Sequence, residues 1–130
     1  MTEWRAGFLD FGHIFRGVLL RHPNTVHLIA AHPAGAYAAG GAMAEDAIDA
    51  LERGGFERPC AIRAMRTTLR VIIGLILLEV GMREPGPPPL PEGPVVADVL
   101  ESVATDDPTE LFRFGLETLM DGLEARLRRA

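Results

Sequence analysis

Residues 60–82, with the sequence CAIRAMRTTLRVIIGLILLEVGM, carry the strongest indication of the architecture. With about 100° between successive residues, the apolar side chains of a helix here fall on two nearly opposite faces. The first face carries Ile62, Leu69, Ile73, Ile76 and Val80, and the second carries Ala64, Val71, Leu75 and Leu78. A helix that is apolar on two sides must be covered on both. We expect one face to meet the core of its own chain and the other a second chain; the alternative is a central helix covered entirely within one chain.

The last helix predicted from the sequence also has an excess of apolar surface. It extends over residues 108–128, and its apolar stripe contains Phe112, Leu116, Leu119, Leu123 and Leu127. Beside this stripe, Leu111, Gly115, Thr118 and Gly122 form a groove of mainly small residues, which lets a second helix approach closely. The two helices can pack together within one chain, or pair with a second copy. The predicted dimer interface contains Val71, Leu75, Leu78, Gly115, Thr118, Leu119, Gly122 and Leu123.

Proline and glycine residues divide the rest of the sequence into shorter helices. These are expected over residues 4–20, 26–31, 36–53 and 95–103, and Gly54-Gly55 is a stop signal after the third. Residues 85–94 contain six prolines and two glycines, which predicts a stiff extended loop. No alternating strand pattern occurs anywhere. The sequence therefore predicts an all-α bundle of about six helices, forming a single domain over residues 1–130.

The start of the last helix carries a specific signal. Asp107 is placed to be the N-cap, Pro108 to be the first helical residue, and Glu110 to complete a pair like a capping box. The helix at 60–82 lacks such a signal, because Arg58 precedes Pro59 where a Ser, Thr or Asp cap is expected.

Composition and charge exclude several classes of protein. Apolar residues make up 48% of the 130-residue chain and charged residues 24%, which suits a globular domain with its own core. A single cysteine excludes an internal disulfide and favours the cytoplasm. The net charge of −5 argues against a surface made for nucleic acid. The most apolar run, residues 71–78, reaches about 12 Å as a helix and is too short for a bilayer core of about 30 Å.

The sequence offers no constellation for catalysis or metal binding. His22, His27 and His32 recur every five residues and so do not share one helical face, and His13 stands apart. Cys60 has no base at a recognisable spacing, the glycine-rich stretch 35–41 lacks a P-loop lysine, and Ser102 lies in no nucleophile motif. We therefore expect no enzyme activity, no catalytic residue, no metal and no cofactor.

What remains is an apolar, aromatic interior between helices, which is the usual place for a small-molecule site in a helical protein. The candidate effector-binding residues are Phe11, Phe15, His27, Met65, Thr68, Leu69 and Ile72, with the threonine and histidine as polar contacts. The alternative is that these side chains are plain core, which aromatic and methionine residues at helical spacing more often are. The expected effector is small and predominantly apolar or aromatic.

Several segments together carry a family resemblance. They are Leu19-Leu20-Arg21-His22-Pro23, residues 50–56 (ALERGGF), residues 64–74 (AMRTTLRVIIG) with Leu77-Leu78-Glu79, and residues 112–124 (FRFGLETLMDGLE). The last segment, with its Phe-x-Phe-Gly-Leu run followed by Leu-x-x-Gly-Leu, is the most specific. In order and spacing the chain resembles the C-terminal regulatory domain of the tetracycline-repressor (TetR) family of bacterial transcription regulators.

The resemblance implies a homodimer in which the two long C-terminal helices of each chain form a four-helix bundle. It also implies an effector pocket whose occupancy controls DNA binding by a helix-turn-helix domain. Such a domain is not expected within this chain, so DNA contact is expected only indirectly. The alternative function is a ligand-free helical dimerisation module that acts through a partner regulator. A sealed core would favour that alternative, whereas a cavity on the order of several hundred Å³ would favour the sensor.

Overall fold

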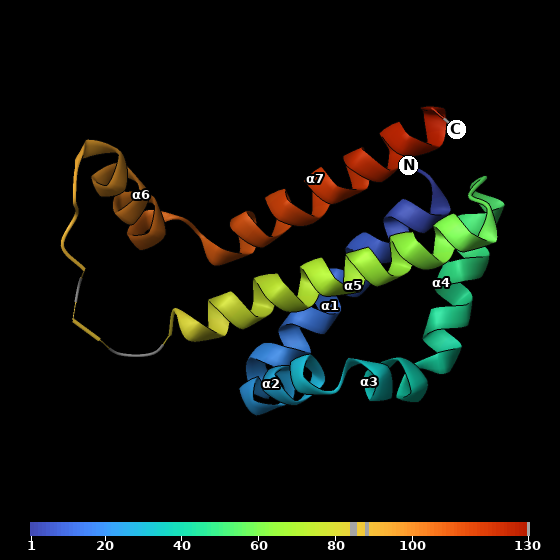
Figure 1. The fold of residues 1–130 in the computed structure, drawn as a ribbon, viewed down its shortest axis with the longest axis horizontal. Coiled ribbons are helices and arrows are strands. Elements are labelled where there is room, and N and C mark those ends of the chain that lie inside the picture. The colour runs from blue at the N-terminus through green and yellow to red at the C-terminus, as the bar shows by residue number, and fades with distance from the viewer. Residues whose placement is uncertain (84–85, 88, 130) are drawn as a thin grey trace.

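The computed structural model describes residues 1–83, 86–87 and 89–129 of the chain. In these residues it contains seven α-helices and no strand, which confirms the predicted all-α class (Figure 1). The helices are α1 (Glu3–Arg21), α2 (Pro23–Ala31), α3 (Pro33–Ala39), α4 (Gly41–Arg53), α5 (Arg58–Gly81), α6 (Pro94–Thr105) and α7 (Pro108–Arg129).

The prediction of one helix over residues 36–53 is wrong. The structure breaks this segment into α3 and α4 at Gly40, which has φ −94° and ψ 24° and so leaves the helical conformation. Two successive glycines, Gly40 and Gly41, weaken a helix at this point by about 1 kcal/mol each relative to alanine. Pro33 begins α3 as well as following α2, because a proline in the first helical turn leaves no intrahelical hydrogen bond unmade.

The start of α7 agrees with its sequence signal. The Asp107 carboxylate accepts a hydrogen bond from the backbone N–H of Thr109 at 3.0 Å, which confirms the predicted N-cap. Glu110 does not close a capping box; its carboxylate accepts a hydrogen bond from the Arg113 guanidinium at 2.8 Å. The long central helix, α5, begins at Arg58, two residues before the predicted start, and Glu57 is its N-cap without a side-chain hydrogen bond.

The predicted proline-rich loop over residues 85–94 is described only in part. Residues 86–87 and 89–93 lie outside helices, as expected, whereas Pro85 and Pro88 lie outside the described residues. Pro94 is the first residue of α6 and not the end of the loop.

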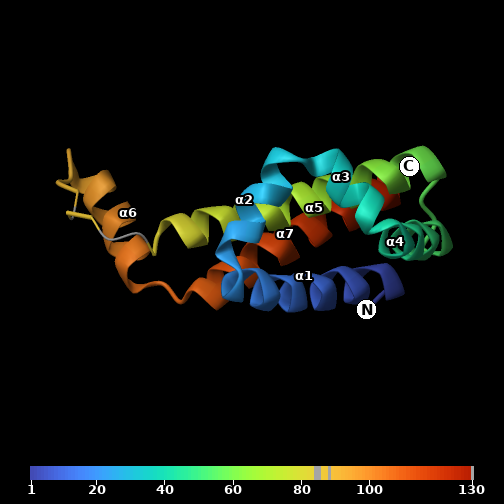
Figure 2. The ribbon, with the colours of Figure 1, turned by 90° about the horizontal axis from the view of Figure 1, so that it is seen from below.

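Helix α5 forms the centre of the domain. It packs against α1, α2, α4 and α7, and α7 runs alongside it in the opposite direction (Figures 1 and 2). Its buried side chains are Ala61, Ala64, Met65, Thr68, Ile72, Ile76 and Val80. The core face thus lies between the two predicted apolar faces, and Ile62 of the first face is 40% exposed. The reason is that α1 and α7 pack on the side of α5 between these two faces, and the spacing of apolar residues does not predict where neighbouring helices pack.

A largely buried ion pair ties three helices together. The Arg16 guanidinium on α1 donates hydrogen bonds of 2.8 and 2.6 Å to the two oxygens of Glu79 on α5. It also donates to the Thr109 hydroxyl at 3.2 Å and lies 5.6 Å from the centre of the Phe112 ring, both on α7. The hydrogen bonds to Glu79 raise the pKa of Arg16, so the guanidinium stays charged.

Helix α6 lies apart from the rest of the domain (Figures 1 and 2). It buries none of its residues and packs on no other helix of the described chain. Four valines, Val95, Val96, Val99 and Val103, are between 43% and 74% exposed. An isolated helix of this length is marginal in water, so α6 needs a covering surface to be stable.

Candidate functional site

A cavity of about 1280 Å³ lies between α1, α2, α3, α4 and α5. One wall consists of large apolar side chains, among which Phe11 and Phe15 stack with their ring centres 5.0 Å apart. The large lining residues are Trp4, Phe8, Phe11, Phe15, Ile29, Tyr37, Met43, Met65, Leu69 and Ile73. Its size and apolar walls suit a small organic ligand.

Alanines explain why this space stays open. The cavity walls that come from α2, α3 and α4 contain Ala30, Ala34, Ala36, Ala39, Ala44, Ala47 and Ala50. Methyl groups fill less of the space between helices than the large apolar side chains that α2, α3 and α4 contribute, which are Ile29, Tyr37 and Met43. The break at Gly40 adds to this, because it lets α3 run from α2 to α4 without packing on α1 or α5 (Figure 1).

Four of the seven effector candidates named from the sequence line this cavity, namely Phe11, Phe15, Met65 and Leu69. The other three do not. His27 is exposed on α2. Thr68 is fully buried and donates its hydroxyl to the backbone oxygen of Ala64 at 2.8 Å, which leaves no hydrogen for a ligand.

Ile72, the third of these, is fully buried in the core. It lies beside Gly12, where α1 approaches closely: a Cβ built on Gly12 would come 2.5 Å from a Leu116 methyl and 3.5 Å from an Ile72 methyl. Thr68 and Ile72 therefore occupy the core face of α5, whereas Met65, Leu69 and Ile73 form the edge that reaches the cavity. These two edges are adjacent on α5, so the spacing of apolar residues in the sequence could not distinguish the core residues from the cavity residues.

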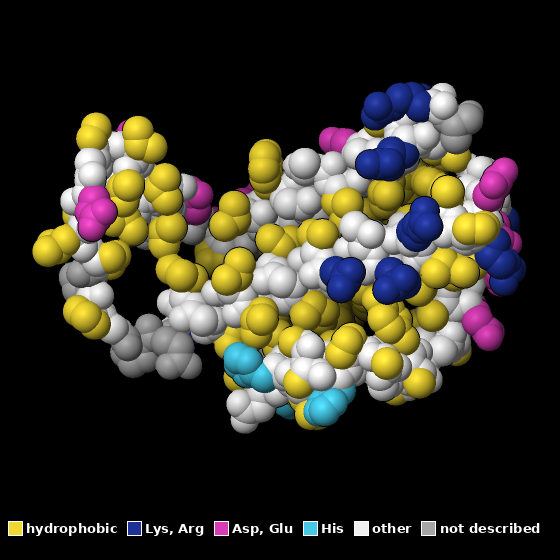
Figure 3. All heavy atoms as spheres, viewed as in Figure 1, with side chains coloured by type: hydrophobic (Ala, Val, Ile, Leu, Met, Phe, Trp, Pro, Cys, Tyr) yellow, Lys and Arg dark blue, Asp and Glu magenta, His cyan; other side chains and the backbone are white. Residues whose placement is uncertain are grey.

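Charged side chains lie at the rim of the cavity in two separate groups. The first surrounds Arg53, which makes an ion pair with Glu3 at 2.8 Å and interacts electrostatically with Asp46 and Asp49. The hydrogen bond from Arg53, together with its charge, lowers the pKa of Glu3. The second group is on α5 and consists of Arg66 and Arg70. Figure 3 shows basic side chains along α5 at the edge of a hollow with hydrophobic walls.

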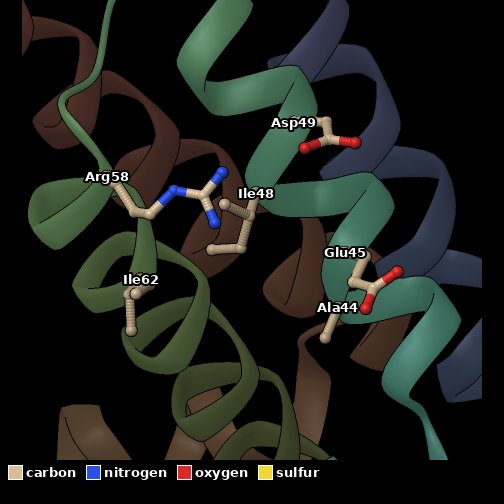
Figure 4. Close-up of a pocket in the computed structure, with 6 residues that line it drawn as sticks. All are labelled: Ala44, Glu45, Ile48, Asp49, Arg58 and Ile62. Atoms are coloured by element: carbon tan, nitrogen blue, oxygen red, sulfur yellow. The ribbon is translucent and has the colours of Figure 1, made fainter.

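A second, smaller cleft of about 300 Å³ lies between α4 and α5 (Figure 4). Arg58 extends across it toward Ile48 on α4, while Glu45 and Asp49 flank the opening (Figure 4). The Arg58 guanidinium is already paired with Glu52 at 2.7 Å. Among the described residues, the one basic group that lines this cleft is therefore already paired, and the apolar lining of the cleft consists of Ala44, Ile48 and Ile62 alone.

The outer surface of α5 and α7 remains strongly apolar. Leu78 on α5 is 71% exposed, and Phe114 and Leu111 on α7 are 70% and 54% exposed. Of the predicted interface residues, Thr118 and Gly122 are exposed and Val71, Leu75, Gly115 and Leu119 are half-buried. Leu123 is only 8% exposed and belongs to the core, because it lies on the side of α7 that faces its own chain.

The groove of small residues on α7 is partly filled within the chain. A Cβ built on Gly115 would come 3.2 Å from a Leu75 methyl, so these two helices already approach closely at this point. A Cβ on Gly122 would meet nothing within 4 Å. The open part of the groove is therefore its C-terminal half. Phe114, which is not among the interface residues predicted from the sequence, is also exposed on the helical face of Leu111 and Thr118.

No group of three or more His, Cys, Asp or Glu side chains in the described residues is arranged to hold a metal ion. Among the helices of the described residues, none has the length and apolar character needed to cross a membrane.

A helical domain with a ligand-sized cavity that opens to the surface, and with an uncovered apolar face, has the features of a regulatory domain that senses a small molecule. Residues 1–127 match the family model described as the tetracyclin repressor-like C-terminal domain. The chain belongs to this family, and the resemblance inferred from the sequence is confirmed. Searches of curated proteins and of solved structures gave no match. Domains of this family are generally the ligand-binding and dimerisation part of transcription regulators, and they are non-enzymatic.

Proposed function

We propose that this domain binds a small, predominantly apolar or aromatic effector in the cavity between α1 and α5. The observation that carries the proposal is the cavity itself, about 1280 Å³ in volume and walled by aromatic, aliphatic and methionine side chains. Effector binding would control DNA binding in the cytoplasm by a helix-turn-helix domain outside residues 1–130. The rival function, a ligand-free dimerisation module, predicts a sealed core, and the cavity disfavours it.

We also propose that the domain acts as a homodimer through the outer faces of α5 and α7. The exposed Leu78 and Phe114 support this, because a contiguous apolar patch on a helical pair is a common mark of an interface. Two helices from each of two chains can form a twofold-symmetric four-helix bundle. The apolar surface of α6, which nothing covers within the described chain, supports a second chain as well.

The effector site can be tested by filling the cavity. Ala47 on α4 is half-buried and lines the cavity. In Ala47→Trp the indole side chain should therefore occupy part of the space that the ligand needs. In a thermal-shift screen, apolar and aromatic compounds should raise the melting temperature of the unmodified chain. A ligand at a hundredfold excess over its Kd stabilises the fold by about 2.7 kcal/mol, and Ala47→Trp should abolish this stabilisation.

The matched control is Ala42→Trp, because Ala42 is exposed on the same helix and does not line the cavity. This variant should keep the full response to each compound. The proposal fails if only highly charged compounds lacking an apolar body raise the melting temperature, or if both variants respond alike.

The proposed function assigns no DNA contact to this chain. With a net charge of −5, the isolated chain should show no sequence-specific DNA affinity in a gel-shift assay. The assay should compare a mixed-sequence duplex pool with and without added salt. Binding that depends on sequence and persists at high salt would contradict this assignment.

A further inference from the structure

Of the three arginines that line the cavity, only Arg53 is paired with a carboxylate, that of Glu3. The side chains of Arg66 and Arg70 make no hydrogen bond or ion pair with any other residue in the described part of the chain. They stand four residues apart on α5, so their side chains start about 5–6 Å from each other on one helical face. Two neighbouring guanidinium groups of like charge repel each other, and an anion placed between them removes the repulsion.

The apolar wall lies beside these two arginines. Met65, Leu69 and Ile73, which alternate with Arg66 and Arg70 along α5, all line the same cavity. A ligand that packs on these apolar side chains therefore brings any group at its end to the two guanidinium groups. The acidic side chains of the rim gather instead around Arg53, where Glu3, Asp46 and Asp49 interact with one basic group.

We infer that the effector is an apolar anion, with an aromatic or aliphatic body in the cavity and a carboxylate held by Arg66 and Arg70. Guanidinium groups match carboxylates in shape and can donate two parallel hydrogen bonds to them. The inference rests on the proposed effector site and adds to it the chemical class of the ligand. A neutral body of the same shape would bind by its apolar contacts alone.

The test uses three probes with one aromatic body and different charges, namely pyrenebutyrate, its uncharged amide pyrenebutanamide, and the cation pyrenebutylamine. Binding to the full 130-residue chain is measured by energy transfer to pyrene from Trp4, the only tryptophan, which lines the cavity. The anion should bind about tenfold more tightly than the amide, because charge-assisted hydrogen bonds exceed neutral ones in strength. The preference should shrink as ionic strength rises, since both arginines are exposed.

The double variant Arg66→Gln/Arg70→Gln should lose the preference for the anion and keep the affinity for the amide. Its melting temperature without ligand should stay close to that of the unmodified chain, because both side chains are exposed and unpaired with other described residues. Arg63→Gln is the matched control, since Arg63 is also exposed on α5 but does not line the cavity. This control should retain the preference in full.

The outcomes separate the inference from the proposed function. If the amide or the cation binds at least as tightly as the anion, the inference is overturned while the apolar effector site stands. A preference for the anion that survives in the double variant likewise overturns the assignment to Arg66 and Arg70. If none of the three probes binds, the inference and the proposed effector site both fail.

Discussion

The isolated chain is expected to sediment at twice the 14.1 kDa mass of one chain at micromolar concentration. The reason is the apolar outer face of α5 and α7, where Leu78 and Phe114 are 71% and 70% exposed. Covering such a side chain gains roughly 1.5–3 kcal/mol relative to leaving it in water. Analytical ultracentrifugation over a range of concentrations measures the dissociation constant. A single species of one-chain mass under ordinary buffer conditions would refute the dimer.

Two substitutions should weaken this dimer strongly. Phe114→Glu places a charge in the apolar face and should raise the dissociation constant by about a hundredfold or more, since burying an unpaired carboxylate is costly. Gly122→Leu should also weaken the dimer, by overpacking the open end of the groove on α7. Gly122 is suited to this test because a Cβ there meets nothing within 4 Å in its own chain, so the fold itself should not be strained.

The control for the second substitution is Gly35→Leu. Gly35 lies on α3, away from α5 and α7, and a Cβ there also meets nothing within 4 Å. The two variants should unfold at similar denaturant concentrations when both are measured at the same protein concentration, low enough for the dimer to have dissociated. Equal dissociation constants for Gly122→Leu and Gly35→Leu would show that the groove is not part of the interface.

Arg16→Met is expected to be the most damaging single charge removal, lowering the free energy of unfolding by about 3 kcal/mol. The side chains of Arg16 and Glu79 are each only 13% exposed, so removing the guanidinium leaves a carboxylate that is largely buried and unpaired. The substitution also removes the hydrogen bond to Thr109 and the cation–π contact with Phe112. Urea denaturation, with the protein concentration held fixed, measures the loss.

A double-mutant cycle separates the contribution of the Arg16–Glu79 ion pair to stability from the contribution of side-chain packing. Arg16→Met/Glu79→Leu should recover much of the lost stability, because a buried ion pair replaced by apolar groups of similar volume is often close to neutral. The surface pair between Arg113 and Glu110 is the comparison, with side chains 46% and 61% exposed. Arg113→Met should cost less than about 0.5 kcal/mol. Equal costs for Arg16→Met and Arg113→Met would contradict the proposed role of Arg16 in joining three helices.

Local sequence signals predicted most helix boundaries, because the groups that begin and end a helix are close together in the chain. The N-cap at Asp107 depends on a hydrogen bond to a residue two positions away. The stop at Gly54-Gly55 is equally local, since Gly55 takes a positive φ of 106° that side-chain-bearing residues rarely adopt. The single helix predicted over residues 36–53 was wrong, because the alanine-rich pattern hid the helix break that Gly40 and Gly41 cause near its start.

The sequence by itself determined that this protein is all-α, and that the helix around residues 60–82 carries more apolar surface than one neighbouring helix can cover. The first conclusion follows from the spacing of apolar residues along the whole chain, and the second from their spacing within residues 60–82. Which edge of α5 faces the core and which edge lines the cavity depends on how the helices pack together, and sequence spacing does not predict it. The tertiary structure also joined Arg16 to Glu79, 63 positions away, and left Arg66 and Arg70 beside an apolar space. Periodicity shows which side chains share a face, but the distance to the next helix decides whether that face is packed, open or charged.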